Sequence, residues 1–328
     1  MKRLILHIGR HKTGTTSVQL FLNRNQEALR AHNILYPQSG RDVSEGQSPE
    51  NRAAHHRIAQ CLSRADPASD EYLKAFVSDL AKESHEYSTI ILSSEAFQNV
   101  SDMSRVANVF EGYSIEAIGY LREYLSYVAS AYAQEVKGSN LVADFEFFEQ
   151  KFSLNLRRFI DRWSSVASKT TWRLYNRSAL HNGDIVSDFA RVAELPFGDD
   201  GIRDESNISI SGNLLGFKLL ANSLGLNDPY YGTVIRRLAA ENPRFRGPIY
   251  LDREEQRQIR RRNSCNTTLA EMFERVDEAD FEKGNKVFET DTIETDFAHI
   301  LSELKDFQAV YEHPILRKLS GENFPSAI

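Results

Sequence analysis

The sequence predicts an α/β fold with a central, mostly parallel sheet and a helical C-terminal part. Short apolar runs alternate with helical patterns over the first 195 residues, and the pattern is almost wholly helical from about residue 212 onward. Strands that alternate with helices are joined by right-handed crossovers, which produce a parallel sheet covered by helices on both faces. We therefore expect one domain over 1–328, with an α/β core at about 1–195 and a helical part at about 196–328.

The first expected strand is the apolar run RLILHI at 3–8, which ends at Gly9. A turn rich in Gly and Thr follows, and then a helical pattern whose apolar face is formed by Val18, Phe21, Leu22 and Leu29. Asn33 is expected to end this helix in the left-handed conformation. The stretch 36–49 is polar and has no apolar period, which predicts a surface loop.

Three further strands are expected downstream. Helical patterns at 51–64 and 70–85 precede an apolar run at 88–97, STIILSSEAF. The run 114–121 leads directly to Arg122 and to a helix that Gly138 ends. A fourth strand is expected at 170–175.

Composition excludes several classes of protein. The 40 basic and 46 acidic residues give a net charge of −6, so we expect no nucleic-acid partner. Cys61 and Cys265 lie far apart and form no CxxC pair, which argues against disulfides and cysteine-based metal sites and favours free thiols in a reducing compartment. The N-terminal apolar run stops at Ile8, too early for a signal peptide or a membrane span. We expect a cytoplasmic protein with no integral membrane segment.

The segment GRHKTGTT, residues 9–16, lies where a strand passes into a helix, which is where backbone amides and the positive helix end bind phosphate. The spacing from Gly9 to Gly14 matches half of a Walker A loop, but Thr15 stands where that motif requires lysine, and the lysine is Lys12. This change favours a nucleotide without β- and γ-phosphates, bound without a metal, over kinase substrates. A glycine turn without a ligand is the alternative.

The sequence HIGRHKTGTTS closely resembles the 5′-phosphosulfate-binding loop of sulfotransferases that use 3′-phosphoadenosine-5′-phosphosulfate (PAPS), above all the bacterial branch with HIG-x-x-KTGTTS-x-Q. The resemblance extends through Tyr36-Pro37 and around Arg122, and fades beyond about 195. It implies a P-loop-like three-layer fold in which Lys12 contacts the phosphosulfate bridge. It also implies that the phosphate is cradled by Thr13, Gly14, Thr15 and Thr16. Ser17 occupies the place where cytosolic members carry a tryptophan against adenine.

The second motif of that family places an arginine at a strand end and a serine eight residues later, both on the 3′-phosphate. Arg122 and Ser130 have this spacing, and an arginine fork matches phosphate geometry. Glu123-Tyr124 replace the usual Asp-Pro or Asn-Pro, as in the carbohydrate-type and bacterial branches. A surface salt bridge at Arg122 is the alternative.

Sulfuryl transfer needs a base near the acceptor. Glu95 ends an expected strand, in the order in which related enzymes present a catalytic histidine or glutamate, and the carboxyl ends of parallel strands form the ligand crevice. A structural carboxylate is the alternative. His55 and His56 compete for the role because imidazole titrates near neutrality, with His56 ahead. His7, inside the first strand, is expected to be structural.

Three other features have structural interpretations that we favour. The basic helical face at 257–262 is expected to be paired with neighbouring acids, although it could bind an anionic glycan. The aromatic side chains after Arg122 are expected to pack in the core, although they could line a sugar site; they are Tyr124, Tyr127 and Tyr132. Residues 271–305 are acidic and are expected to be solvated.

Together these features predict a PAPS-dependent sulfotransferase that releases PAP and needs no metal. By resemblance alone, the acceptor is a hydroxyl of a small molecule, a glycan or a glycolipid. Two alternatives stay open: a P-loop nucleotide kinase or triphosphatase, which would bind ATP with Mg²⁺, and a catalytically silent PAP- or PAPS-binding protein. The sequence specifies neither the acceptor nor the oligomeric state.

Overall fold

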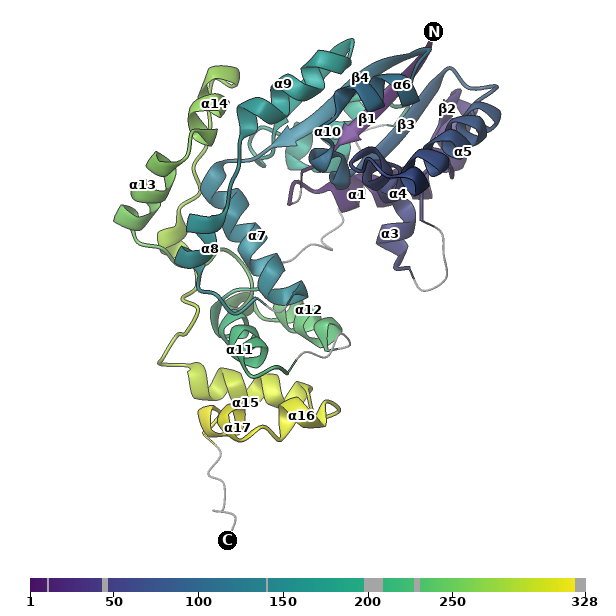
Figure 1. Ribbon diagram of the computed structural model, residues 1–328. Coiled ribbons are helices and arrows are strands. Elements are labelled where there is room, and N and C mark those ends of the chain that lie inside the picture. Colours follow the sequence, from purple (N-terminus) through teal and green to yellow (C-terminus); the bar gives the residue numbers. More distant parts are fainter. Residues whose placement is uncertain (11, 43–46, 140, 198–208, 227–230, 322–328) are drawn as a thin grey trace. The chain divides into compact units, whose positions relative to one another are not determined.

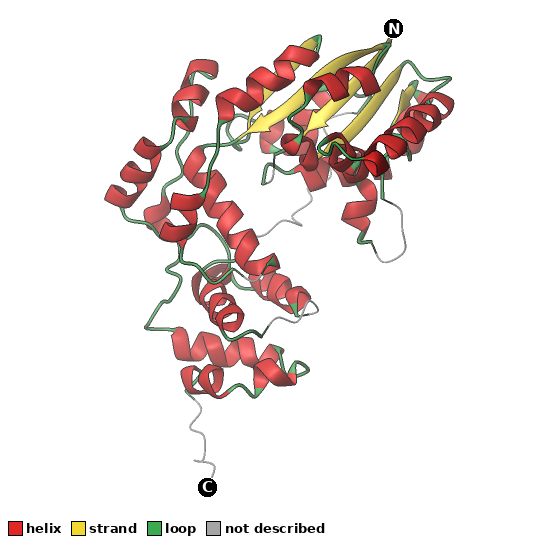
Figure 2. Cartoon of the chain, viewed as in Figure 1, coloured by secondary structure: helices red, strands yellow, loops and turns green. Residues whose placement is uncertain are grey.

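The computed structural model describes residues 1–10, 12–42, 47–139, 141–197, 209–226 and 231–321 (Figure 1). The described residues form two compact units. The first contains residues of 1–123, 155–204 and 267–277, and the second contains residues of 124–154, 205–266 and 278–328. The strands of the sheet all belong to the first unit (Figure 2).

The first unit is built on a five-stranded parallel sheet with the order β2-β3-β1-β4-β5. The strands are β1 (Lys2–Ile8), β2 (Ile34–Leu35), β3 (Thr89–Ser94), β4 (Tyr113–Leu121) and β5 (Lys169–Leu174). In the register of β1 and β3, His7 is paired with Ser93 and Ile8 with Ser94. The loop after β1 therefore starts beside Glu95, the first residue after β3.

Helices cover both faces of this sheet. α1 (Thr15–Arg24) and α10 (Ile185–Val192) pack on one face, where Val18 and Phe189 join a buried cluster with strand residues such as Ile5 and Ile118. α6 (Met103–Val109) and α9 (Leu156–Val166) lie along the other face (Figure 1). The remaining helices of this unit are α2 (Gln26–Ala31), α3 (Pro49–Ala53), α4 (His56–Leu62) and α5 (Pro67–Glu83). This is the expected three-layer, P-loop-like α/β fold.

The order of the strands places the ligand edge of the sheet. The connection from β1 to β2 passes β3, whereas the connection from β3 to β4 passes β1 in the opposite direction. Right-handed crossovers therefore put the helices that follow β1 and β3 on opposite faces. Ligands of open α/β sheets bind at the carboxyl ends of strands where the connections diverge in this way. The loop after β1 and the residues after β3 lie at that edge.

The second unit is helical. Its core includes Phe217 of α11 (Gly212–Ser223) and Phe297 of α15 (Ile293–Glu303), whose rings are 5.2 Å apart. The other helices are α7 (Tyr124–Gly138), α8 (Phe145–Lys151), α12 (Gly232–Glu241), α13 (Arg253–Arg262), α16 (Gln308–Tyr311) and α17 (Pro314–Leu319). Of α14 (Cys265–Met272), the first two residues belong to the second unit and the others to the first. Across the described ranges, no helix combines the length and the apolar character needed to span a membrane.

The four expected strands are confirmed to within a few residues, and Asn33 has the predicted left-handed φ of 63°. The expected helix over 51–64 is wrong in one respect, because it is divided into α3 and α4. The break falls at Ala54 and His55, where the amide of His55 donates to the carbonyl of Ser93 on β3 at 2.8 Å. A tertiary hydrogen bond therefore interrupts a pattern that is helical in sequence.

The prediction of a surface loop over 36–49 is also wrong in part. Tyr36 and Arg41 are buried, with exposed fractions of 1% and 6%. The Tyr36 hydroxyl donates to the carbonyl of Ala53 at 2.7 Å, and the Arg41 guanidinium lies 4.3 Å from the centre of the Tyr36 ring. The start of this polar stretch is therefore anchored in the core by one aromatic residue and one arginine. Residues 43–46 lie outside the described residues.

The expectation that the acidic segment 271–305 is simply solvated is wrong in part. Asp296 is buried, accepts a hydrogen bond from Asn213 at 2.8 Å and pairs with Arg244 at 2.9 Å. Ile300 of the same helix is fully buried. The acidic segment therefore contains an amphipathic helix, α15. Its buried carboxylate, that of Asp296, is bound by the amide of Asn213 and by the guanidinium of Arg244.

The structural interpretations of the basic and aromatic patches and of the cysteines are confirmed. On α13, ion pairs join Arg257 to Glu254, Arg260 to Glu278 and Arg262 to Glu149. Buried aromatic side chains pack within the second unit at Tyr124, Tyr127 and Tyr132. Both cysteines are buried free thiols.

Replacing Gly119 in β4 by alanine should lower the free energy of unfolding by about 1–3 kcal/mol, because it overpacks the core. A Cβ at Gly119 would overlap the Trp172 ring on β5, which is itself packed against Phe159 at 5.5 Å between ring centres. Urea unfolding measures the difference. Gly138→Ala is the control, since a Cβ there meets no atom among the described residues within 4 Å. Equal stability of the two variants would show that the Trp172 contact does not constrain position 119.

Candidate active site

The loop after β1 turns sharply before α1 begins. Lys12 and Gly14 both have left-handed backbones, with φ of 66° and 73°. Gly9 must lack a side chain, because a Cβ there would overlap the Thr15 side chain. Gly14 is the N-cap of α1 and provides no side-chain cap. The first amides of a helix have no partner within it, so Thr15 and Thr16 present N–H groups at the positive end of α1, as an anion site requires.

The threonine hydroxyls stabilise this loop from within. Thr13 and Thr15 are buried, and their Oγ1 atoms donate to the carbonyl of Arg10 at 2.8 and 3.3 Å. Ser17 is also buried, and its amide donates to the carbonyl of Gly14 at 3.1 Å. Because both hydroxyls are bound to Arg10, Thr13 and Thr15 would contact a phosphate through their backbone amides. These hydrogen bonds hold the described residues of the loop in place.

Arg122, which follows β4, contacts the same loop. Its Nη1 donates to the carbonyl of Lys12 at 3.0 Å, and its guanidinium lies 5.7 Å from the centre of the Tyr175 ring. Two residues that the sequence assigns to different phosphates are therefore neighbours. Ser130 lies buried in α7 of the second unit. Its pairing with Arg122 stays a prediction.

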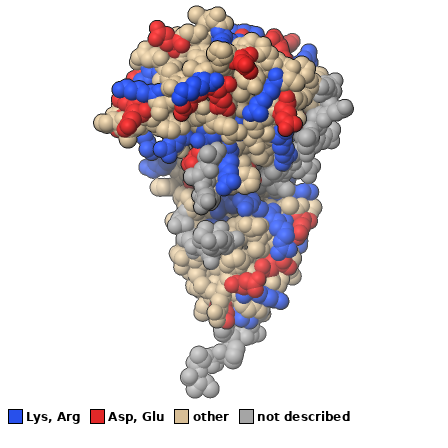
Figure 3. Space-filling model, turned by 90° about the vertical axis from the view of Figure 1, so that its right-hand side faces the viewer, with Lys and Arg blue, Asp and Glu red and all other residues tan. Residues whose placement is uncertain are grey.

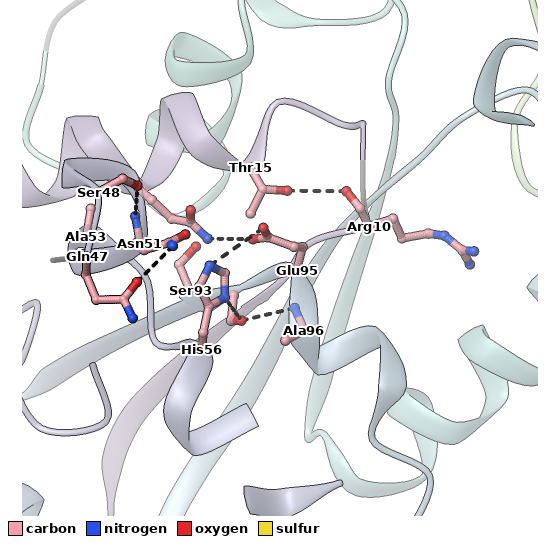
Figure 4. A network of polar contacts seen from close by, with 12 residues as sticks. Arg10, Thr15, Gln47, Ser48, Asn51, Ala53, His56, Ser93, Glu95 and Ala96 are labelled. Carbon is pink, nitrogen blue, oxygen red and sulfur yellow. Dashed lines mark hydrogen bonds and ion pairs between the residues drawn. The ribbon is translucent and has the colours of Figure 1, made fainter. Parts of the chain in front are cut away.

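Glu95 and His56 form a pair at the carboxyl end of β3 (Figure 4). Nε2 of His56 is 3.7 Å from Oε1 of Glu95, and the two side chains are 19% and 20% exposed. The other carboxylate oxygen, Oε2, accepts a hydrogen bond from Nε2 of Gln19 at 3.0 Å. Residues that we had treated as competing bases are thus partners, and both remain accessible to an acceptor.

The Ser94 hydroxyl orients His56. It accepts a hydrogen bond from the amide of Ala96 at 3.0 Å and lies 2.8 Å from Nδ1 of His56. A hydroxyl that accepts from an amide can donate its own hydrogen to Nδ1, which leaves the imidazole hydrogen on Nε2, facing Glu95. With that tautomer, each carboxylate oxygen faces an N–H group, that of Gln19 at 3.0 Å from Oε2 and that of His56 at 3.7 Å from Oε1, and these contacts fix the position of the carboxylate.

His55 is structural. Its side chain is fully buried, and its ring nitrogens form hydrogen bonds with the carbonyl of Pro37 at 3.1 Å and the amide of Ser93 at 3.2 Å. Burial lowers the pKa of His55 well below its ordinary value. The ring is therefore neutral, and each of its nitrogens already has a hydrogen-bond partner. His55 is thus excluded as the catalytic base.

His7 is also structural, as expected. It is buried on the α1 side of the sheet, against Phe189 at 4.8 Å between ring centres, and its Nδ1 is 2.8 Å from the Ser93 hydroxyl. Burial lowers the pKa of His7 to about 4. The ring stays neutral at physiological pH.

Sequence reasoning missed Gln19 and Ser94. Gln19 is 1% exposed, although a glutamine on a surface helix is usually solvated. Its position in the sequence could have identified it as a site residue. Gln19 lies four residues after Thr15, which places it on the side of α1 that carries the loop residues. Ser94 is the last residue of a buried strand, where polar side chains enter the ligand edge.

Comparisons with known proteins add little to this geometry. No family model matches the chain, and no curated protein matches it significantly. A solved structure from the PezAT chromosomal toxin–antitoxin system of the human pathogen Streptococcus pneumoniae aligns at 17% sequence identity, over 69% of this chain and 87% of that chain, with a TM-score of 0.27. A similarity of this size supports no conclusion about function.

Proposed function

We propose that the chain is a PAPS-dependent sulfotransferase that moves a sulfuryl group to a hydroxyl of a carbohydrate or glycolipid. The observation that carries the proposal is the adjacency of two features at one sheet edge. A phosphate-type loop follows β1, and a half-buried carboxylate with an imidazole partner follows β3, the next strand in the sheet. Binding of an anion and removal of a proton are the two tasks that sulfuryl transfer requires.

The loop suits the single 5′-phosphate of PAPS better than a triphosphate. A triphosphatase places a lysine directly after the second glycine and a Ser/Thr hydroxyl on Mg²⁺. Here Thr15 stands in the place of that lysine, with its hydroxyl bound to the carbonyl of Arg10, and the lysine is Lys12, before Gly14. The amides of Thr15 and Thr16 would hold the 5′-phosphate, and Lys12 would face the bridge to the sulfuryl group.

The reaction assigns one task to each group. Glu95 takes the proton of the acceptor hydroxyl as that oxygen forms its bond to sulfur. The bond between sulfur and the bridging oxygen breaks, and its electron pair stays on the phosphate of PAP, where Lys12 stabilises the charge. Gln19 and His56 hold Glu95 in place. PAP leaves, and the proton passes from Glu95 to solvent.

Transfer of ³⁵S from labelled PAPS to a panel of sugars, glycolipids and phenols tests the proposal. We expect a labelled carbohydrate or glycolipid product, with PAP binding retained in EDTA. ATP binding that depends on Mg²⁺ would instead indicate a nucleotide kinase or triphosphatase. PAP affinity without transfer to any member of the panel would indicate a silent binding protein.

Arg122→Ala should weaken PAP binding by about one to two orders of magnitude and barely change AMP binding, because a charge-assisted Arg–phosphate contact contributes about 1.5–3 kcal/mol. AMP lacks the 3′-phosphate that distinguishes the two ligands. Ser130→Ala should show the same selectivity with a smaller loss, since a neutral hydroxyl contributes less. Calorimetric titration of both variants with PAP and AMP measures these effects. Equal losses for the two nucleotides would mean that Arg122 acts by holding the carbonyl of Lys12.

A further inference from the structure

The break between α3 and α4 determines where the imidazole of His56 lies. Residues 51–64 have a helical pattern in sequence, yet Ala54 has an extended backbone, with φ of −100° and ψ of 151°. His56 is the first residue of α4. In a continuous helix each residue is turned by about 100° from the one before it, so His56 would point in another direction. Its contact with Glu95 therefore depends on the groups that maintain the break.

Tyr36 fixes the chain on one side of the break. It follows β2 directly, and β2 is paired with β3, the strand that precedes Glu95. The Tyr36 hydroxyl donates to the carbonyl of Ala53, the last residue of α3, at 2.7 Å, and the tyrosine is 1% exposed. Burial raises the pKa of this hydroxyl, so it stays protonated and acts as the donor. The end of α3 is thus tied to the sheet.

The same turn holds His55, on the other side of the break. The rings of Tyr36 and His55 meet edge to face, with 4.8 Å between their centres. A carbonyl can only accept and an amide can only donate. Nε2 of His55 therefore donates to the carbonyl of Pro37 at 3.1 Å, and Nδ1 accepts from the amide of Ser93 at 3.2 Å. Tyr36 and Pro37 thus contact the chain before and after the break.

Arg41 in turn holds the Tyr36 ring. Its guanidinium lies 4.3 Å from the ring centre and donates to Oδ1 of Asn23 at 2.6 Å and to the carbonyl of Tyr36 at 3.0 Å. Basic and acidic side chains lie next to one another over much of the face drawn in Figure 3, whereas Arg41 is 6% exposed and packs on an aromatic ring. A cation–π contact is stronger when it is shielded from water. These contacts restrict the orientation of Tyr36.

We infer that Tyr36 is a positioning residue for the Glu95–His56 pair. By holding Ala53 and His55, it sets the start of α4 and with it the position of the imidazole of His56. The catalytic consequence rests on the proposed function, because it requires Glu95 to act as the base. Misplacement of a catalytic group by a fraction of an ångström to an ångström lowers the rate of a reaction without weakening the binding of a ligand elsewhere in the site.

Tyr36→Phe tests this inference, because it removes the hydroxyl and keeps the ring that contacts Arg41 and His55. We expect kcat for transfer from PAPS to fall about threefold to tenfold, and no further than in His56→Ala, since Tyr36 acts through that residue. PAP affinity should stay within about twofold of the wild-type value. Adding Tyr36→Phe to His56→Ala should cause no further loss of kcat, because no imidazole is left to position.

Tyr132→Phe is the matched control. Tyr132 is also 1% exposed, and its hydroxyl donates to the carbonyl of Ala143 at 3.1 Å within the second unit. Both variants lose one buried hydrogen bond, so their melting temperatures should fall by similar amounts. Only Tyr36→Phe should lower kcat. Equal losses of kcat in the two variants would assign the effect to reduced stability and overturn the inference. Independent, additive losses from Tyr36→Phe and His56→Ala would also overturn it.

NMR of ¹⁵N-labelled histidine rings gives a readout that does not require activity. The Ser94 hydroxyl places the hydrogen of His56 on Nε2, and ring ¹⁵N shifts report which nitrogen carries it. At pH 8 the His56 signal, identified by its absence in His56→Ala, should show the Nε2–H tautomer in the wild type and in Tyr132→Phe. It should show a mixture of tautomers in Tyr36→Phe.

The two readouts separate the inference from the proposed function. An unchanged tautomer of His56 in Tyr36→Phe would overturn the positioning role. A changed tautomer in that variant, with no sulfuryl transfer by the wild type, would support the positioning role and count against the proposed function alone.

Discussion

Lys12→Ala should lower kcat by about 10²- to 10³-fold while changing PAP affinity little, because the ammonium stabilises charge that develops on the bridging oxygen only as the bond to sulfur breaks. The backbone should tolerate this change. Lys12 already has a left-handed φ of 66°, and alanine is no more strained there than lysine. The hydrogen bond from Arg122 ends on the carbonyl of Lys12, which the substitution keeps. Steady-state transfer from PAPS measures the loss.

Lys12→Arg is the matched variant, since it keeps the charge at the same backbone position. It should recover part of the lost activity, because a guanidinium also stabilises the leaving phosphate but reaches it with different geometry. Thermal unfolding of both variants should match that of the wild type. Activity near the wild-type level in Lys12→Ala would remove the central role assigned to this loop.

The sequence was sufficient to predict the class of fold because the apolar runs of buried parallel strands are nearly continuous. The segments 3–8 and 114–121 show this pattern, and both are strands. β2 was not predicted because two residues, Ile34 and Leu35, are too few to show a period. The order of the strands could not be predicted from the sequence either, because it depends on which connection passes over which strand.

The site was only partly predictable for a related reason. The phosphate loop is contiguous in sequence, so its strand, glycines and lysine could be identified together. The Glu95–His56 pair joins residues 39 positions apart, and its geometry depends on the break between α3 and α4, where the amide of His55 bonds to β3. No local pattern encodes that tertiary bond.

The structure shows that Glu95 and His56, the two candidate bases, form one pair. Two independent candidate bases would contribute separately, whereas two side chains in one pair act as a unit. Effects of residues that act together are not additive. A comparison of single and double variants therefore distinguishes the two cases.

Glu95→Gln should lower kcat by about 10²- to 10⁴-fold with little change in nucleotide affinity, because glutamine keeps the shape of the side chain but cannot accept a proton. Its amide oxygen can still accept the hydrogen bond from Gln19 that the carboxylate accepts at 3.0 Å, so the local packing should persist. Glu86→Gln, an exposed carboxylate before β3, is the control and should be as active as the wild type.

His56→Ala should cost much less, about tenfold, because it removes a group that orients the base and leaves the base itself. The variant with both substitutions should be no slower than Glu95→Gln, since His56 has no carboxylate left to orient. Rates of PAPS turnover for the three variants, taken with their PAP affinities, complete the cycle. If His56→Ala were the slower of the two single variants, the imidazole would be the base and Glu95 the residue that orients it through the 3.7 Å contact.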